Sequence, residues 1–304
     1  MHIQLANALG WITLMLRLTL SAIVLTVFCH QAKGDTGCGG AELSCAVSLG
    51  TYHIALPVST PPKGTKRPAV LFFHGAGGLG RDVISEQFYL LPFREAGYAI
   101  IAPNGLVRGN GFGTGWSFRP DGPQQRNELS FAKEIIADVA EKFDVDRSKI
   151  LLSGFSIGSS LVWYLACKEP SLGAAYAPLA GGFWRPHPQS CAGPIDLLQT
   201  HGWRDQTVPL EGRPLRGGEL YQGDIFEGLQ LWRAIDGCKR LRADSFETGP
   251  IYWIRTWSTC DSGRELALAL HPGDHDSIPE GWAEMARLWF ERRLNSLPQS
   301  ALAP

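Results

Sequence analysis

The stretch KILLSGFSIG at residues 149–158 decides the fold. Residues 149–153 form a largely apolar run typical of a buried strand, and Gly158 opens a segment with helical spacing. Between them lies the run GFSIG, which fits the pattern G-x-S-x-G. Strand, tight turn and helix in this order are the context in which that pattern places a nucleophilic serine. The stretch therefore predicts an α/β protein with Ser156 at a sharp turn above a sheet.

The same alternation of strand and helix patterns extends along the chain. Apolar runs typical of buried strands lie at residues 52–58, 69–73, 98–102, 149–153, 175–180, 196–200 and 265–270. Segments with helical spacing lie between them, at residues 85–96, 128–143, 158–168, 221–235 and 280–294. Such alternation predicts a mainly parallel sheet with helices on both faces, and ligands then bind at the carboxyl ends of the strands.

Composition excludes several classes of partner. The chain has 304 residues, of which 44% are hydrophobic and 19% charged, with a formal net charge of -1. Lysine and arginine do not cluster in runs, so we expect no binding to nucleic acid or to an anionic membrane. We expect a neutral small molecule as ligand. No repeat or long linker follows residue 35, which predicts a single catalytic domain over residues 35–304.

The first 34 residues have the pattern of a signal peptide. No acidic residue precedes Asp35, Arg17 supplies a positive flank, and the apolar run at residues 18–28 is too short to span a bilayer. We predict cleavage near residue 34 and a secreted or periplasmic protein. The alternatives are an uncleaved membrane anchor or a lipoprotein, but a bulky residue precedes Cys29.

Six cysteines remain once the signal peptide is removed, and an even number fits an oxidising compartment. The sequence alone does not choose among their pairings. Our hypothesis joins neighbours because each bond would close a short loop, which gives Cys38 with Cys45, Cys167 with Cys191, and Cys238 with Cys260. A structural zinc site is the competing interpretation, but the sequence has no C-x-x-C pair to build one.

A serine hydroxyl is a poor nucleophile without a base, so the hypothesis requires an acid and a histidine later in the chain. Asp205 follows the strand that ends at Thr200, which places it on the same sheet edge as Ser156. Its other interpretation is an aspartate that caps a turn. His275 lies in a loop between the last strand and the last helix, from which it is able to reach back to Ser156.

Two alternatives compete with His275 as the base. His271 is a rival histidine, but it abuts the strand and Pro272 stiffens the chain beside it. A metal site built with the nearby Asp274 and Asp276 is the other alternative. We disfavour it because a third placed ligand is lacking and the metal would compete with the serine for the same histidine. We therefore expect neither a metal nor a cofactor.

The oxyanion that forms during acyl transfer needs two hydrogen-bond donors. The amide of Ile157 opens a helix directly after the serine, so it is the first candidate. The second should come from the loop after the strand at residues 69–73, where the sequence reads HGAGG at residues 74–78. We assign the Ala76 amide as this donor and His74 as a structural anchor of the loop.

The glycine-rich stretch at residues 109–116 follows a strand but lacks the glycine spacing of a dinucleotide site. We interpret it as a loop at the mouth of the site. Trp116 in this stretch is a candidate for substrate contact, with a core aromatic as the alternative, and Phe155 beside the serine is a second candidate.

Taken together, HGAGG (74–78), GFSIG (154–158), HGWRDQTVP (201–209) and HPGDHDSIP (271–279) resemble the polyhydroxybutyrate depolymerase and feruloyl esterase family of secreted α/β-hydrolases. The resemblance covers roughly residues 50–295. It implies the α/β-hydrolase fold and hydrolysis of carboxylic esters through an acyl-serine, with Ser156, Asp205 and His275 as the triad. The cysteines near residues 167–191 and 238–260 also resemble disulfides of the family.

Two departures from the family pattern bear on substrate preference. Asn127 and Glu128 stand where an acidic pair is expected, and Ser159 replaces a glycine or alanine. Polymer-degrading members carry a linker and a binding module that we do not find here. We therefore expect soluble esters or oligomers of acetyl, feruloyl or hydroxyalkanoate type. The alternatives are a serine peptidase on the same fold and a non-catalytic binding protein.

Overall fold

The computed structural model describes residues 37–59, 62, 64–86, 89–109, 113–276 and 278–296. These residues all belong to one compact unit, Asp35–Pro304. The predicted signal peptide, residues 1–34, lies outside the described residues. No helix within the described ranges is long and apolar enough to cross a membrane.

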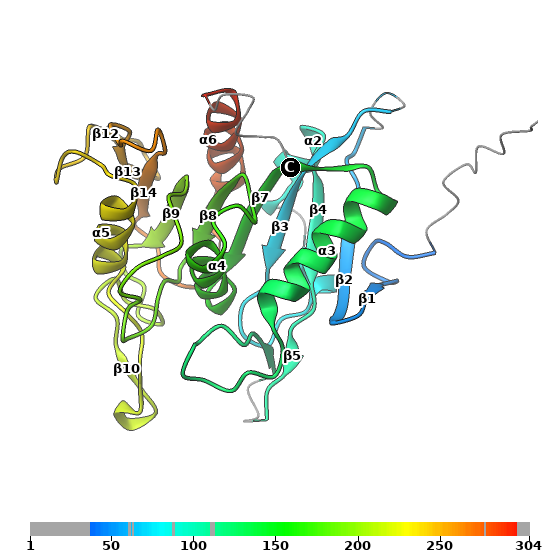
Figure 1. Cartoon of the computed structure of the whole chain (residues 1–304), viewed down its shortest axis with the longest axis horizontal. Coiled ribbons are helices and arrows are strands. Elements are labelled where there is room, and N and C mark those ends of the chain that lie inside the picture. Colours follow the sequence, from blue (N-terminus) through cyan, green and yellow to red (C-terminus); the bar gives the residue numbers. More distant parts are fainter. Residues whose placement is uncertain are drawn as a thin grey trace, which may run out of the picture. The chain divides into compact units, whose positions relative to one another are not determined.

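A 10-stranded sheet forms the centre of this unit (Figure 1). In spatial order its strands are β1 (Cys45–Val47), β2 (Gly50–Ala55), β4 (Ala99–Pro103), β3 (Arg67–Phe73), β7 (Val145–Phe155), β8 (Ala175–Leu179), β9 (Leu197–Gly202), β14 (Leu266–His271), β13 (Trp253–Trp257) and β12 (Ser245–Thr248). From β4 to β14 all neighbours run parallel, whereas the strands at both edges are antiparallel. The predicted mainly parallel sheet is confirmed.

Helices cover both faces of the sheet, as predicted (Figure 1). One face packs against α3 (Glu128–Lys142), α4 (Ile157–Lys168) and α5 (Ile225–Ile235), and the other against α1 (Gly80–Ser85), α2 (Leu91–Glu95) and α6 (Trp282–Ser296). Each face has its own apolar core, represented by fully buried Phe131 and Trp232 on the first and by Phe93 and Trp282 on the second. Burial of this kind stabilises a domain by about 1.5 to 3 kcal/mol for each large side chain.

Two of the predicted helix boundaries are wrong. The helix predicted at residues 85–96 is α2, which begins only at Leu91 because Pro92 occupies its first turn, and the preceding helix α1 already ends at Ser85. The helix predicted from residue 221 begins instead at Ile225, because the Asp224 carboxylate accepts hydrogen bonds from the next turn and so caps it there.

Two small hairpins stand beside the sheet, and the sequence patterns did not reveal them. One is β5 (Leu106–Val107) with β6 (Thr114–Gly115), and the other is β10 (Pro214–Leu215) with β11 (Leu220–Tyr221). Figure 1 shows β5 and β10 at the end of the unit where the parallel strands terminate. Both hairpins therefore border the edge at which ligands bind in such sheets.

The three predicted disulfides are confirmed, since Cys38 bonds Cys45, Cys167 bonds Cys191, and Cys238 bonds Cys260. The second disulfide joins the end of α4 to the loop after β8.

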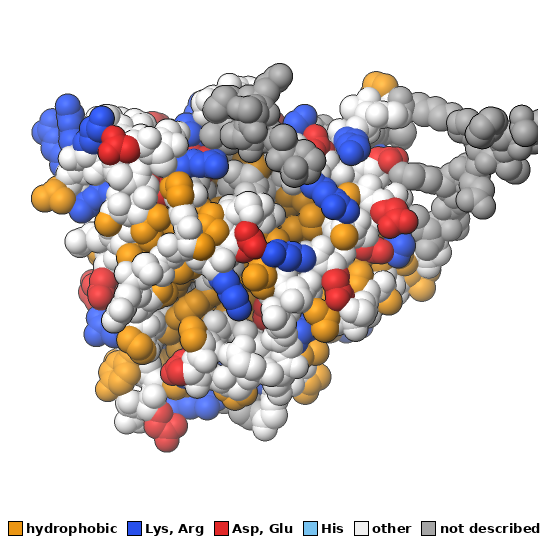
Figure 2. Space-filling view, viewed as in Figure 1, with side chains coloured by type: hydrophobic (Ala, Val, Ile, Leu, Met, Phe, Trp, Pro, Cys, Tyr) orange, Lys and Arg blue, Asp and Glu red, His pale blue; other side chains and the backbone are white. Residues whose placement is uncertain are grey.

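On the face shown in Figure 2, acidic and basic side chains are interspersed with hydrophobic patches.

Candidate active site

The site begins at the junction of β7 and α4, where the chain makes the predicted tight turn. Ser156 has φ 58° and ψ -121°, a backbone conformation that side chains rarely adopt, and it serves as the N-cap residue of α4. Its hydroxyl does not cap the helix and remains available for other contacts. Strain held in this way at one residue is typical of a functional position.

The two glycines of GFSIG are required by close packing. A Cβ on Gly158 would overlap the carbonyl oxygen of Phe73 on β3, and a Cβ on Gly154 would lie 2.7 Å from the carbonyl carbon of Gly158. Glycine is the residue that permits strand and helix to approach so closely. The motif therefore follows from the geometry of the turn.

The structure brings the three predicted side chains together at the carboxyl edge of the sheet. The Nε2 atom of His275 lies 2.9 Å from the Oγ of Ser156, and its Nδ1 lies 2.7 Å from Oδ2 of Asp205. A carboxylate only accepts hydrogen bonds, so Nδ1 carries the proton and Nε2 is free to accept the serine proton. The side chains come from segments after β7, β9 and β14, far apart in the chain.

Asp205 is buried and held by its own loop. Its Oδ1 accepts hydrogen bonds from the backbone amides of Thr207 at 2.9 Å and Val208 at 2.7 Å. Burial alone would raise the pKa of this carboxyl, but the hydrogen bonds from His275 and Val208 outweigh burial and lower the pKa below its usual value. The carboxylate is therefore charged and fixed in place at neutral pH.

A second histidine, His201, was missed by sequence reasoning. Its Nε2 lies 3.5 Å from Oδ2 of Asp205. It is fully buried, its Nε2 donates to the carbonyl oxygen of Val208 at 2.7 Å, and its Nδ1 accepts from the side-chain amide of Gln199 at 3.0 Å. Burial lowers its pKa to about 4. His201 is therefore neutral and supports the loop that carries Asp205.

Main-chain hydrogen bonds join the loop after β9 that carries Asp205 (the acid loop) to the loop after β14 that carries His275 (the base loop). The amide of Trp203 donates to the carbonyl of His271 at 2.7 Å, and the amide of Arg204 donates to the carbonyl of Gly273 at 3.0 Å. The Arg204 guanidinium adds a bond of 2.8 Å to the carbonyl of Pro272. These contacts fix the spacing between Asp205 and the segment that carries the base.

The remaining aromatic and histidine candidates all make contacts within the protein. The ring of Phe155 packs on the imidazole of His275, with centroids 4.9 Å apart. The Nδ1 atom of buried His271 accepts a bond from the amide of Gly273 at 3.2 Å, and burial lowers its pKa. Trp116 is only 6% exposed and donates from its indole to the carbonyl of His74 at 2.9 Å.

The two predicted oxyanion donors belong to the helix that follows Ser156 and to the loop after β3. The amide of Ile157 is the first of α4, and Ala76 is exposed in the loop after β3. Within the described ranges neither amide donates a hydrogen bond to another protein group. Gly75 packs directly against the serine, since a Cβ there would lie 3.5 Å from the Cβ of Ser156.

His74 anchors the oxyanion loop, as predicted. Its Nε2 accepts a bond from the amide of Gly105 at 3.0 Å, so the proton lies on Nδ1, which donates to the carbonyl of Gly75 at 2.7 Å. Burial lowers the pKa of His74, which keeps the ring neutral. The loop is thereby held against the segment that leads into the β5–β6 hairpin.

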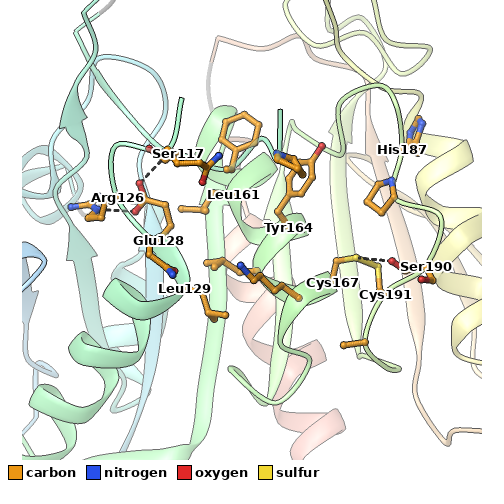
Figure 3. A pocket seen from close by; sticks show the side chains of 18 of the residues that line it. Ser117, Arg126, Glu128, Leu129, Leu161, Tyr164, Cys167, His187, Ser190 and Cys191 are labelled. Atoms are coloured by element: carbon orange, nitrogen blue, oxygen red, sulfur yellow. Dashed lines mark hydrogen bonds and ion pairs between the residues drawn. A yellow bond between two sulfur atoms is a disulfide. The ribbon is translucent and has the colours of Figure 1, made fainter. Parts of the chain in front are cut away.

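Two cavities flank the loop at residues 116–125. The first, of about 840 Å³, lies between α3 and α4 and is shown in Figure 3. Its walls include Tyr164, His187 and the buried ion pair of Arg126 with Glu128, but none of the three triad residues. The second, of about 310 Å³, includes Trp116 in its wall.

The described residues contain no group of three histidine, cysteine or acidic side chains arranged to hold a metal ion. The two acids near the base, Asp274 and Asp276, are exposed, and the amide of Asp276 donates to Asp274 at 3.2 Å.

Comparison with known proteins places the chain in a family. The sequence profile described as alpha/beta hydrolase fold matches residues 68–222. The chain belongs to the alpha/beta hydrolase fold family. Within that family it is feruloyl esterase-like and a carboxylic ester hydrolase, which confirms the predicted enzyme class and that part of the predicted resemblance.

Two relatives of this α/β-hydrolase are fungal. A feruloyl esterase C of Emericella nidulans is 30% identical over 244 residues, covering 76% of this chain and 77% of the relative. A probable feruloyl esterase C of Aspergillus niger is 29% identical over 216 residues, covering 68% and 70%. An acetyl xylan esterase from Aspergillus awamori has a similar fold, with a TM-score of 0.59 and 14% identity over 79% of this chain and 93% of that structure.

Proposed function

We propose that this enzyme hydrolyses soluble carboxylic esters through an acyl intermediate on Ser156, with His275 as base and Asp205 as its partner. The observation that carries the proposal is the placement of His275. One ring nitrogen lies within hydrogen-bond reach of a strained serine and the other within reach of a buried carboxylate. Nucleophile, base and orienting acid in this arrangement are the requirements of serine hydrolysis.

In the first half of the reaction, the Oγ of Ser156 attacks the ester carbonyl carbon while its proton passes to Nε2 of His275. The amides of Ile157 and Ala76 stabilise the resulting oxyanion. Nε2 then returns the proton to the departing alkoxide, which leaves as the alcohol. Asp205 keeps the remaining ring proton on Nδ1 and stabilises the imidazolium that forms in between.

In the second half, a water molecule takes the place of the alcohol. Nε2 of His275 removes a proton from the water as its oxygen attacks the acyl carbon. The carboxylic acid product leaves, and the proton returns to the serine oxygen. The acyl groups that we propose are acetyl, feruloyl or short hydroxyalkanoate groups, and relatives named as feruloyl esterases support this range.

The test combines covalent labelling with activity. A fluorophosphonate probe should add one adduct to the protein, located at Ser156 by peptide mass spectrometry, and Ser156→Ala should abolish both labelling and ester turnover. Ser171→Ala, an exposed serine away from the site, is the matched control and should label fully. Labelling that persists in Ser156→Ala would overturn the assignment. Turnover of amides but not of esters would support the peptidase alternative.

We also propose that the protein is exported and that residues 1–34 are removed. Disulfides at all six remaining cysteines support an oxidising compartment. The intact mass of protein collected outside the cytoplasm should correspond to a chain that begins near Asp35. Recovery of the full-length chain in the membrane fraction would support the uncleaved anchor instead.

A further inference from the structure

Arginine side chains from three separate segments line the cavity of about 310 Å³ beside the site. Arg108 follows β5, Arg119 lies in the loop at residues 116–125, and Arg216 begins the short helix between β10 and β11. No aspartate or glutamate is among the described residues of this wall. The remaining wall includes the aromatic side chains of Trp116 and Trp184. The cavity therefore combines positive charge with two largely buried tryptophans in its wall.

The cavity adjoins the turn that carries the nucleophile. A Cβ built on Gly115 would lie 2.5 Å from Cδ of Arg108 and 3.2 Å from Cδ1 of Ile157, so these two side chains approach the same point. Ile157 directly follows Ser156 and supplies one of the proposed oxyanion donors. The proposal below requires a substrate bound at the serine to extend past this contact into the cavity.

The positive charge of the cavity is only partly neutralised by the protein. Arg119 forms two hydrogen bonds with Asp121, at 3.1 and 2.7 Å, and lies over the Trp184 ring. Within the described part of the chain, neither Arg108 nor Arg216 forms an ion pair. Burial lowers the pKa of Arg108, and the charges of Arg216 and Arg119 lower it further. Arg108 is therefore repelled by the other two guanidinium groups, and a bound anion would relieve that repulsion.

We propose that this cavity binds a carboxylate carried by the ester substrate itself, at a position away from the ester bond. Guanidinium groups bind carboxylates through paired hydrogen bonds, and three of them face this one cavity. The proposal rests on the proposed function and specifies its substrate class. It also revises the expectation of a neutral ligand that came from the balanced net charge.

The test compares pairs of esters that differ only in charge. For a carboxylate on the alcohol side, the pair is 4-acetoxybenzoate and 4-acetoxybenzamide. For a carboxylate on the acyl side, it is the monomethyl ester of adipic acid and the methyl ester of adipamic acid. We expect kcat/KM to be about tenfold higher for the charged member of one pair, because a hydrogen-bonded charge contributes on that scale. The pair that responds identifies the side of the ester that enters the cavity.

The double variant Arg108→Gln/Arg216→Gln should lower this ratio towards one, and Arg108→Lys should keep part of it. The ratio cancels any change common to both substrates, and thermal unfolding checks that the variant is folded. Arg242→Gln, at an exposed arginine outside the cavity, should leave the ratio unchanged. A ratio near one in the unmodified enzyme for both pairs, or a ratio that survives the double variant, would overturn the proposal.

The two proposals fail in different ways. If the neutral esters are hydrolysed and Ser156→Ala abolishes that turnover, the proposed function stands even when the charged members gain no advantage. If none of the four esters is hydrolysed and the fluorophosphonate does not react, the proposed function fails and the carboxylate proposal fails with it.

Discussion

The part of the site that holds Asp205 and His275, here called the corner, differs from the arginine cavity in how many of its polar groups have partners within the protein. At the corner, both carboxylate oxygens, both imidazole nitrogens and several loop amides have partners within the protein. In the cavity, two of the three guanidinium groups form no ion pair within the described residues. Polar groups that are hydrogen-bonded within the protein hold the geometry of the site, whereas charged groups without an ion pair are available to a ligand.

The largest effect should come from breaking the corner at the acid. Asp205→Asn places an amide opposite Nδ1 of His275, which favours the wrong tautomer and leaves no base for the serine. We expect kcat on a neutral ester to fall by about 10⁴-fold, as in other triads, with the thermal unfolding temperature little changed. Stopped assays with high enzyme concentration would measure the remaining turnover.

The matched control for this variant is Asp274→Asn. Asp274 lies in the same base loop but is exposed and does not contact the imidazole. Its replacement should change kcat by less than about twofold. A decrease of similar size in both variants would mean that the charge of the loop matters rather than the contact to His275.

Much of this corner could be predicted from sequence because its signals are local. The strained serine needs glycines on both sides, and Asp205 and His275 each lie in the loop that follows a recognisable strand, β9 or β14. The antiparallel strands β12 and β13 were missed since they lie at the sheet edge, where every residue of β12 is exposed and no buried pattern arises. His201 was missed because a histidine inside an apolar strand has no pattern of its own.

His201 provides a prediction about stability and pH. The pKa of His201 is lowered from 6.5 to about 4 by burial, so between these values the unfolded chain binds a proton that the folded chain does not. Its contribution to stability is complete above pH 6.5 and is lost as the pH falls towards 4. A shift of this size corresponds to about 3 kcal/mol. The stability deficit of His201→Gln relative to the unmodified protein should therefore shrink by about that amount between pH 7 and pH 4.

Urea unfolding at several pH values would measure the stability deficit of His201→Gln, and a deficit that stays constant with pH would contradict the prediction.

Asp236 is the matched comparison, with a pKa shift of opposite sign. Burial raises its pKa from 3.8 to about 7, so the folded protein binds the extra proton and its contribution grows as the pH falls. For Asp236→Asn the deficit should therefore increase towards low pH. In the unmodified protein the contributions of His201 and Asp236 to stability change with pH in opposite directions, so only the variants separate them.

A smaller effect should follow from pushing the two loops apart. In Gly202→Ala, the new Cβ would lie 2.7 Å from the carbonyl oxygen of Asp274 and 2.8 Å from that of Gly273. Both atoms belong to the backbone of the base loop, so the loop must move and carry His275 with it. Misplacement of a catalytic group by about 1 Å lowers rates by about 10²-fold, and we expect kcat to fall on that scale.

Gly193→Ala is the control for added volume, because its Cβ would meet only the ring of Pro170 at an ordinary 3.6 Å. It should leave kcat unchanged. If Gly202→Ala retains full activity, the acid and base loops tolerate more relative movement than their shared hydrogen bonds suggest.

The arginine cavity could not have been predicted from sequence. Arg108, Arg119 and Arg216 are separated along the chain and none belongs to a basic run, so charge patterning indicated no anionic partner. Two short hairpins and one loop bring them together. Net charge describes the whole surface, whereas recognition depends on a few groups that face one cavity.

The smallest predicted effect concerns this cavity and salt. Raising the ionic strength from about 0.01 M to 0.5 M shortens the screening length from about 30 Å to about 4 Å. The preference for a carboxylate ester over its amide counterpart should then fall about threefold, because Arg108 is only partly buried and Arg216 is exposed. Turnover of the neutral ester should change less, since the contacts of the triad are short and mostly buried. Repeating the series with a bulkier anion than chloride would separate screening from occupation of the cavity by the salt. A preference that stays constant across both series would mean that the charge of these arginines does not select the substrate.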